Sequence, residues 1–145
     1  MTLTMVPGPR MPDEERARHW EALFIFRDAR EAFDAAPVID LFAPDGIYEA
    51  QEVENPLVGR EAISGYLRER FAFFAELART RDTGRLIPGL VDLPAYSDHP
   101  CLIFEAEGER QALWVLTLAG EGLIARLDIL TVAPPPSFAR EVSVN

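Results

Sequence analysis

The chain has 145 residues, 48% of them hydrophobic, and a formal net charge of -10 at pH 7. This length fits one domain with a full hydrophobic core. An acidic surface repels phosphate backbones and anionic lipid headgroups, so we expect neither nucleic acid nor a membrane surface as a partner. The N-terminal segment lacks the apolar core of a signal peptide, and no segment has the roughly 20 apolar residues of a membrane span. We therefore expect a cytoplasmic protein.

Residues 1–12 contain three prolines and no hydrophobic period, which predicts a flexible arm. Acidic residues at 13–15 suit the first turn of a helix. The apolar spacing from Trp20 to Ala36 predicts that this helix continues to about Pro37. A short second helix is expected over 38–42, a turn at 44–46 and a strand over 47–50.

A polar loop over 51–57 precedes a third predicted helix, which begins at Gly59. Its apolar residues recur with helical spacing and form one stripe: Ile63, Tyr66, Leu67, Phe71, Phe74, Leu77 and Ala78. The nearby arginines at 79, 81 and 85 are interpreted as cations that complement the C-terminal end of this helix.

After Gly84 the hydrophobic period changes to two, which indicates strands. We expect them over 86–93, 100–106, 111–118 and 123–132. Pro88 and Gly89 indicate a bulge or an edge in the first of these. Helices followed by an antiparallel meander define an α+β fold. The expected organisation is an arm over 1–12, one domain over 13–133 and a Pro-rich tail over 134–145.

The alternation of side chains along strands predicts which residues face the helices. The inward set, chosen as the faces without charges, is Leu102, Phe104, Leu113, Val115, Thr117, Leu127 and Ile129. The outward set includes Ile103, Trp114 and Leu116, which is unusually apolar for a solvent-facing surface. Either the Pro-rich tail or a second protomer would cover it, and we favour a homodimer through this outer sheet face.

The segments LFAPDGIYE, VGREAISGYL and GLIARLDIL resemble the nuclear transport factor 2-like superfamily. Within it, the chain is similar to the polyketide-cyclase (SnoaL-like) and ketosteroid-isomerase branches. The resemblance implies a cone-shaped, curved antiparallel sheet wrapped around a long helix, with N-terminal helices closing the cone. The cone is then the expected ligand site. This superfamily includes both enzymes and binding modules, so the fold alone does not define a reaction.

The ketosteroid-isomerase branch uses a tyrosine, an aspartate base and an aspartic acid that donates to the oxyanion. The resemblance places Phe26, Ala50 and Thr117 at these three positions. None of them is a tyrosine or an acid, so a steroid-isomerase mechanism is not expected.

Four residues are candidates for acid–base or orienting roles: Tyr48, Glu52, His99 and Asp128. Each has a structural alternative. Tyr48 could be a core residue and Glu52 part of a solvated acidic loop. His99 could be an exposed loop residue, and Asp128 a partner of Arg126. Asp128 faces the cone only if the last strand is shifted by one residue.

The predicted ligand-binding residues combine apolar walls with two hydroxyl groups: Phe26, Tyr66, Phe104, Leu113, Val115, Thr117, Leu127 and Ile129. Two isolated histidines and one cysteine offer no metal-ligand spacing, so neither a metal nor a cofactor is expected. The single Cys101 is interpreted as a buried apolar residue.

Two functions remain open at this point. The first is a cofactor-independent enzyme of SnoaL-like type, a cyclase, isomerase or epoxide hydrolase acting on a hydrophobic cyclic molecule. The second is a non-catalytic binding or accessory protein that uses the same cone. An ionisable group at the bottom of the cone favours the enzyme, and a wholly apolar lining favours the binding protein.

Overall fold

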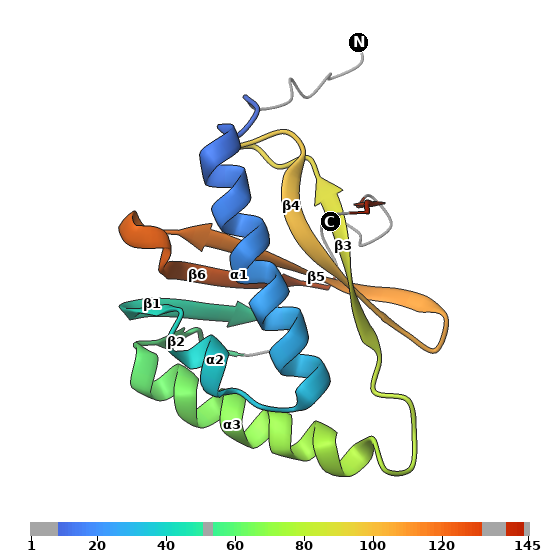
Figure 1. Cartoon of the computed structure of the whole chain (residues 1–145). Helices are drawn as coiled ribbons and strands as arrows, with labels where there is room; N and C mark the ends of the chain where they lie inside the picture. The colour runs from blue at the N-terminus through green and yellow to red at the C-terminus, as the bar shows by residue number, and fades with distance from the viewer. Residues whose placement is uncertain (1–8, 51–53, 132–138, 144–145) are drawn as a thin grey trace.

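The computed structural model describes residues 9–50, 54–131 and 139–143, and has helices packed on one face of a curved sheet (Figure 1). The elements in chain order are α1 (Asp13–Ala32), α2 (Ala36–Ile39), β1 (Phe42–Ala50), β2 (Leu57–Val58), α3 (Arg60–Leu77), β3 (Arg85–Val91), β4 (His99–Ala106), β5 (Glu109–Leu118), a 3-10 turn η1 (Gly120–Gly122), β6 (Ile124–Leu130) and β7 (Arg140–Glu141). The predicted α+β class is confirmed. No helix among the described residues is long and apolar enough to cross a membrane.

The sheet has the strand order β2-β1-β6-β5-β4-β3-β7. Its neighbours are antiparallel except for β1 and β6, which run parallel. The expectation of a wholly antiparallel sheet was therefore wrong at one pair. The cause lies in the chain order, because β6 returns beside β1 after the meander and runs in the same direction.

Helix α1 begins after Pro12 and has three acidic residues in its first turn. Their negative charges interact favourably with the positive end of the helix dipole. It ends at Phe33, whose φ of 55° is left-handed and whose N–H donates to the Arg30 carbonyl. The helix is shorter than predicted, and α2 begins one residue before Pro37. Proline suits this first-turn position because its missing N–H would have no helical partner there.

The main core lies between the helices and the sheet. The helix-facing side of the sheet packs against buried residues of both helices: Leu23 and Phe26 of α1, and Ile63, Leu67 and Phe71 of α3. Helix α1 contacts β4 and β5, whereas α3 contacts β1 and β2. The two helices therefore share the helix-facing side of the sheet.

Strand β3 pairs continuously with β4, so the bulge predicted at Pro88 and Gly89 is absent from this pairing. On its other side it pairs only with the two-residue β7. A Cβ at Gly89 would lie 2.9 Å from the Arg140 carbonyl oxygen and 2.7 Å from Ile103. The glycine therefore permits the close approach of β7, which is the edge strand, so the predicted edge position of β3 is also wrong: β3 lies next to the edge.

The side of the sheet away from the helices carries a second apolar cluster, which we call the outer cluster. Its buried members are Val91, Cys101, Ile103, Leu113, Val115 and Ala139. The C-terminal segment helps to cover it, because Ala139 packs there and its carbonyl accepts a 2.7 Å hydrogen bond from Arg110. Trp114 and Leu116, which we placed on this face, pack instead against the helix-side core. Two of the three residues behind the dimer prediction were thus assigned to the wrong face, and the homodimer itself stays a prediction.

Candidate functional site

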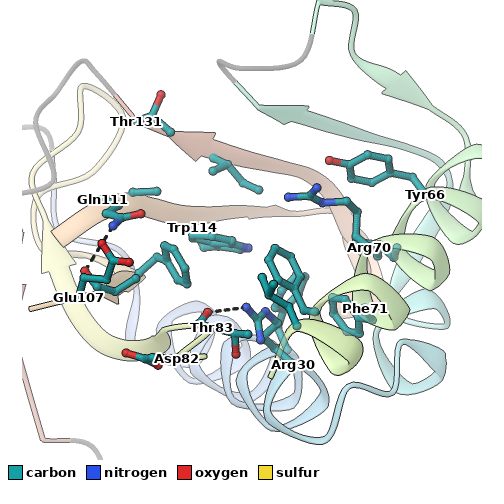
Figure 2. Close-up of a pocket in the computed structure, with 18 of the residues that line it drawn as sticks. Arg30, Tyr66, Arg70, Phe71, Asp82, Thr83, Glu107, Gln111, Trp114 and Thr131 are labelled. Atoms are coloured by element: carbon teal, nitrogen blue, oxygen red, sulfur yellow. Dashed lines mark hydrogen bonds between the residues drawn. The ribbon is translucent and has the colours of Figure 1, made fainter. Parts of the chain in front are cut away.

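A cavity of about 560 Å³ lies between α1, α3 and the helix-facing side of the sheet (Figure 2). This volume lies within the range of small-molecule sites, about 300–1,000 Å³. Its apolar wall is mainly aromatic: Phe26, Tyr48, Tyr66, Leu67, Phe71, Phe74, Leu77, Phe104, Ala106, Ala112, Trp114 and Ile129. Its polar lining consists of Arg30, Arg70, Arg81, Asp82, Thr83, Glu107, Gln111 and Thr131.

The aromatic wall is built from packed ring pairs. Phe104 of β4 and Trp114 of β5 have ring centroids 5.3 Å apart, and the rings of Phe26 and Phe71 meet edge to face at 6.3 Å. Packed rings hold their shape, and their faces accept planar apolar groups. The wall is therefore suited to a ligand that contains rings.

Two tyrosines bring hydroxyl groups to this wall. Tyr48 of β1 and Tyr66 of α3 have ring centroids 5.2 Å apart, and both line the cavity. Tyr48 is buried and Tyr66 half-buried. The predicted inward direction of Tyr48 is confirmed.

Two arginines contribute positive charge. Arg30 is buried, donates a 2.8 Å hydrogen bond to the Thr83 carbonyl, and lies over the Phe74 ring at 4.3 Å. Arg70 is exposed and lies 4.8 Å from the centroid of the same ring. Burial, and secondarily the charge of Arg70, lowers the pKa of the Arg30 guanidinium below its ordinary value.

The faces predicted for β4 and β6 are confirmed, since Leu102, Leu127 and Ile129 belong to the helix-side core and Phe104 packs against it. Phe26, Tyr66, Phe104 and Ile129 line the cavity, whereas Leu127 is buried without lining it. Their contact with a ligand stays a prediction.

The predicted face of β5 is wrong. Leu113 and Val115 belong to the outer cluster, and Thr117 is exposed opposite Arg126. Trp114 pairs with Leu102 on one side and Ile129 on the other, and paired residues point to the same face. The inward residues Trp114 and Leu116 carry no carboxyl group, so the correction supplies no counterpart for the isomerase oxyanion donor.

Asp128 is not in the cavity. It pairs with Val115 of β5 and Glu49 of β1, and both of its carboxylate oxygens accept from Arg126 Nε at 3.1 Å. Arg126 also forms an ion pair with Glu49. The structural alternative, a partner for Arg126, is the one observed.

His99 also lies outside the cavity lining, at the start of β4. It is buried, not exposed, and its ring meets His19 edge on at 5.2 Å. Its Nδ1 lies 2.8 Å from the Pro100 carbonyl, and burial lowers the pKa of His99 below 6.5. His19, a residue of α1, is also buried, with Nδ1 2.8 Å from the Glu15 carbonyl.

The fourth candidate, Glu52, lies outside the described residues. Within the described ranges, no group of three or more His, Cys, Asp or Glu side chains could hold a metal ion. The carboxylates that line the cavity are Asp82 and Glu107, both exposed. Asp82 accepts a 2.9 Å hydrogen bond from the Gly84 N–H.

Sequence reasoning missed Arg30, Arg70 and Trp114. A signal for Arg30 was present, because it follows Leu23 and Phe26 by seven and four residues and so shares their helix face. Arg81 also lines the cavity, whereas Arg79 and Arg85 pair with Glu76 and Glu105.

No protein-family model and no curated protein matches this chain. Solved structures do. A SnoaL-like protein of unknown function from Burkholderia thailandensis is similar with a TM-score of 0.59 and 15% identity, over 79% of this chain and 95% of the other. A steroid delta-isomerase from Pseudomonas aeruginosa has a TM-score of 0.58 and 17% identity, over 79% of each chain.

A third similar structure is the Orange Carotenoid Protein of Anabaena (Nostoc) binding canthaxanthin. Its TM-score is 0.54 and its identity 19%, over 90% of this chain and 39% of that longer chain. At these identities the similarity defines the fold and not the activity. The chain has the fold of the SnoaL-like and nuclear transport factor 2-like proteins, as its sequence predicted.

Proposed function

We propose that this protein binds a hydrophobic, ring-containing small molecule in the cavity between α1, α3 and the sheet. The observation that carries the proposal is the wall of packed aromatic rings around a space of about 560 Å³. Burial of apolar ligand surface contributes about 25 cal/mol per Å², so such a wall favours rings over polar metabolites. The similarity to the Orange Carotenoid Protein supports the proposal, because that protein contains this fold and binds the hydrophobic molecule canthaxanthin.

The test uses Trp114 as a reporter from inside the wall. The chain has two tryptophans, and Trp20 stacks on Phe24 of the same helix outside the cavity lining. In a Trp20→Phe background, a panel of polycyclic aromatics and terpenoids is titrated while Trp114 fluorescence is followed. Saturable quenching supports the proposal, and its absence for the whole panel contradicts it.

A cavity-filling variant ties the signal to the site. Ala112 is buried in the wall, so Ala112→Phe should occupy the cavity and weaken binding at least tenfold. Ala72→Phe makes the same change at an exposed position of α3 and should leave the affinity unaltered. Equal affinities of the two variants would mean that the ligand binds elsewhere.

The second candidate function is a cofactor-independent enzyme of SnoaL-like type acting on the same ligand. It is favoured by the adjacent Tyr48 and Tyr66 rings on the cavity wall, whose hydroxyls could orient a carbonyl or transfer a proton. Product analysis after incubation with each bound ligand tests it. Tyr66→Phe should then lower kcat by about 10²-fold or more while ligand affinity changes only several-fold. If every bound ligand is recovered unchanged, the enzyme hypothesis is contradicted and binding is the function that remains.

A further inference from the structure

The guanidinium group of Arg30 is a buried charge without a carboxylate partner among the described residues. The residue is only 8% exposed, and its side-chain hydrogen bond goes to the neutral Thr83 carbonyl. A buried charge is normally paired, because removing it from water is costly. Contact with the Phe33 and Phe74 rings compensates part of this cost.

Arg70 adds a second cation to the same place. Its guanidinium faces the same Phe74 ring, and it forms no salt bridge with any described carboxylate. The two acidic side chains of the lining, Asp82 and Glu107, also make no salt bridge with either arginine. Two like charges thus lie beside the aromatic wall of an otherwise acidic protein (Figure 2).

This arrangement suits one ligand chemistry. A guanidinium has five N–H donors, and Arg30 uses one on Thr83, so donors remain for a planar anion. Arginine binds carboxylates through paired N–H···O contacts that are stronger than neutral hydrogen bonds. An anion bound near the two cations would also offset their mutual repulsion.

We propose that the ligand of the cavity is a hydrophobic ring compound that bears a carboxylate, which the Arg30 and Arg70 guanidinium groups bind while the rings contact the aromatic wall. This rests on the proposed binding function and specifies its ligand class. The carboxylate gives the ligand one defined orientation, since Arg30 and Arg70 both lie beside the Phe74 ring, whereas the third arginine of the lining, Arg81, is exposed and makes no cation–π contact with that ring.

The test compares two fluorescent probes of matched shape, pyrenecarboxylate and pyrenemethanol, by titration of the whole protein. Wild type should bind the carboxylate about tenfold more tightly, the effect of one charge-assisted contact at a partly exposed site. Arg70→Met should abolish this preference without weakening the binding of the alcohol. Arg68→Met removes the same charge from an exposed position of the same helix outside the lining, and should preserve the preference.

The outcomes separate this inference from the proposed function. If both probes bind wild type equally, or if Arg68→Met and Arg70→Met act alike, the carboxylate site is refuted while ring binding stands. If neither probe binds, ring binding by this cavity is contradicted. Arg30→Met, with its thermal melt recorded to verify folding, should also lose the preference.

Discussion

The position of Phe104 in the cavity wall depends on the glycine at 84. Gly84 has a φ of +85°, and a Cβ there would lie 2.5 Å and 2.6 Å from two atoms of the Phe104 ring. It would also lie 2.9 Å from the Glu105 carbonyl oxygen, which is backbone. Gly84→Ala must therefore displace the ring, and the wall on which a ligand would rest changes shape.

The expected cost has two parts. A left-handed backbone at a residue with a Cβ costs about 1–2 kcal/mol. Overpacking against the Phe104 ring and the β4 backbone adds about 1–3 kcal/mol. The free energy of unfolding should thus fall by about 2–5 kcal/mol, and the affinity for ring ligands should fall as well.

Gly108→Ala is the matched control, because Gly108 has a φ of +77° but no atom within 4 Å of an added Cβ. Urea denaturation of both variants and ligand titration of the folded proteins are the measurements. Gly108→Ala should lower the free energy of unfolding only by the cost of the left-handed backbone, and it should retain full affinity for ring ligands. Equal destabilisation by the two substitutions would refute the contact between position 84 and the Phe104 ring.

Three further predictions concern other parts of the chain. The pKa of His99 in the folded protein lies below its ordinary value of 6.5, so below that pH the unfolded chain binds a proton that the folded protein does not. The free energy of unfolding should therefore decrease as the pH falls below 6.5, by up to about 1.4 kcal/mol per pH unit. Urea titrations between about pH 7.5 and 5 should show a shallower decrease for His99→Gln, in which Glu15, Arg16 and His19 still surround the site; identical slopes contradict this. Burial raises the pKa of the Cys101 thiol to about 12, so native protein should react with a disulfide reagent at pH 8 far more slowly than protein in urea, and equal rates contradict this. For the predicted homodimer, light scattering at tens of micromolar protein should give twice the mass of the chain. Thr117→Arg, on the exposed part of the outer sheet face, should give a monomer. A monomeric wild-type protein would contradict the prediction.

The sequence predicted the elements well because their signals are local. The acidic first turn of α1 and the stripe from Ile63 to Phe71 on α3 indicate helices without knowledge of their neighbours. The inward direction of Tyr48 and Ile129 could also be predicted locally, because their strands carry charged residues on only one face. Where one face of an element is visibly polar, the other can be assigned to the core.

Strand β5 had no such signal, because its central run is apolar on both faces. The rule that the uncharged face meets the helices fails when the opposite face is also covered. Here Ala139, from a segment distant in sequence, packs on that opposite face. The pairing of Trp114 with Leu102 and Ile129 fixes the orientation, and this register is a tertiary property. For the same reason Trp114, expected on the outer face, lines the cavity, and Val115, expected in it, does not.

The acidic composition and the arginine pair act on a ligand over different ranges. A net charge of -10 repels an approaching carboxylate, but salt screens this field beyond about 8 Å under physiological conditions. Arg30 and Arg70 act only in contact, where the low-dielectric wall strengthens the interaction. Salt should therefore speed association of an anionic ligand and also speed its release, while a neutral analogue would show neither effect. A protein of this charge would bind few anions on its surface, so an aromatic carboxylate held here owes its retention to the cavity rather than to general attraction.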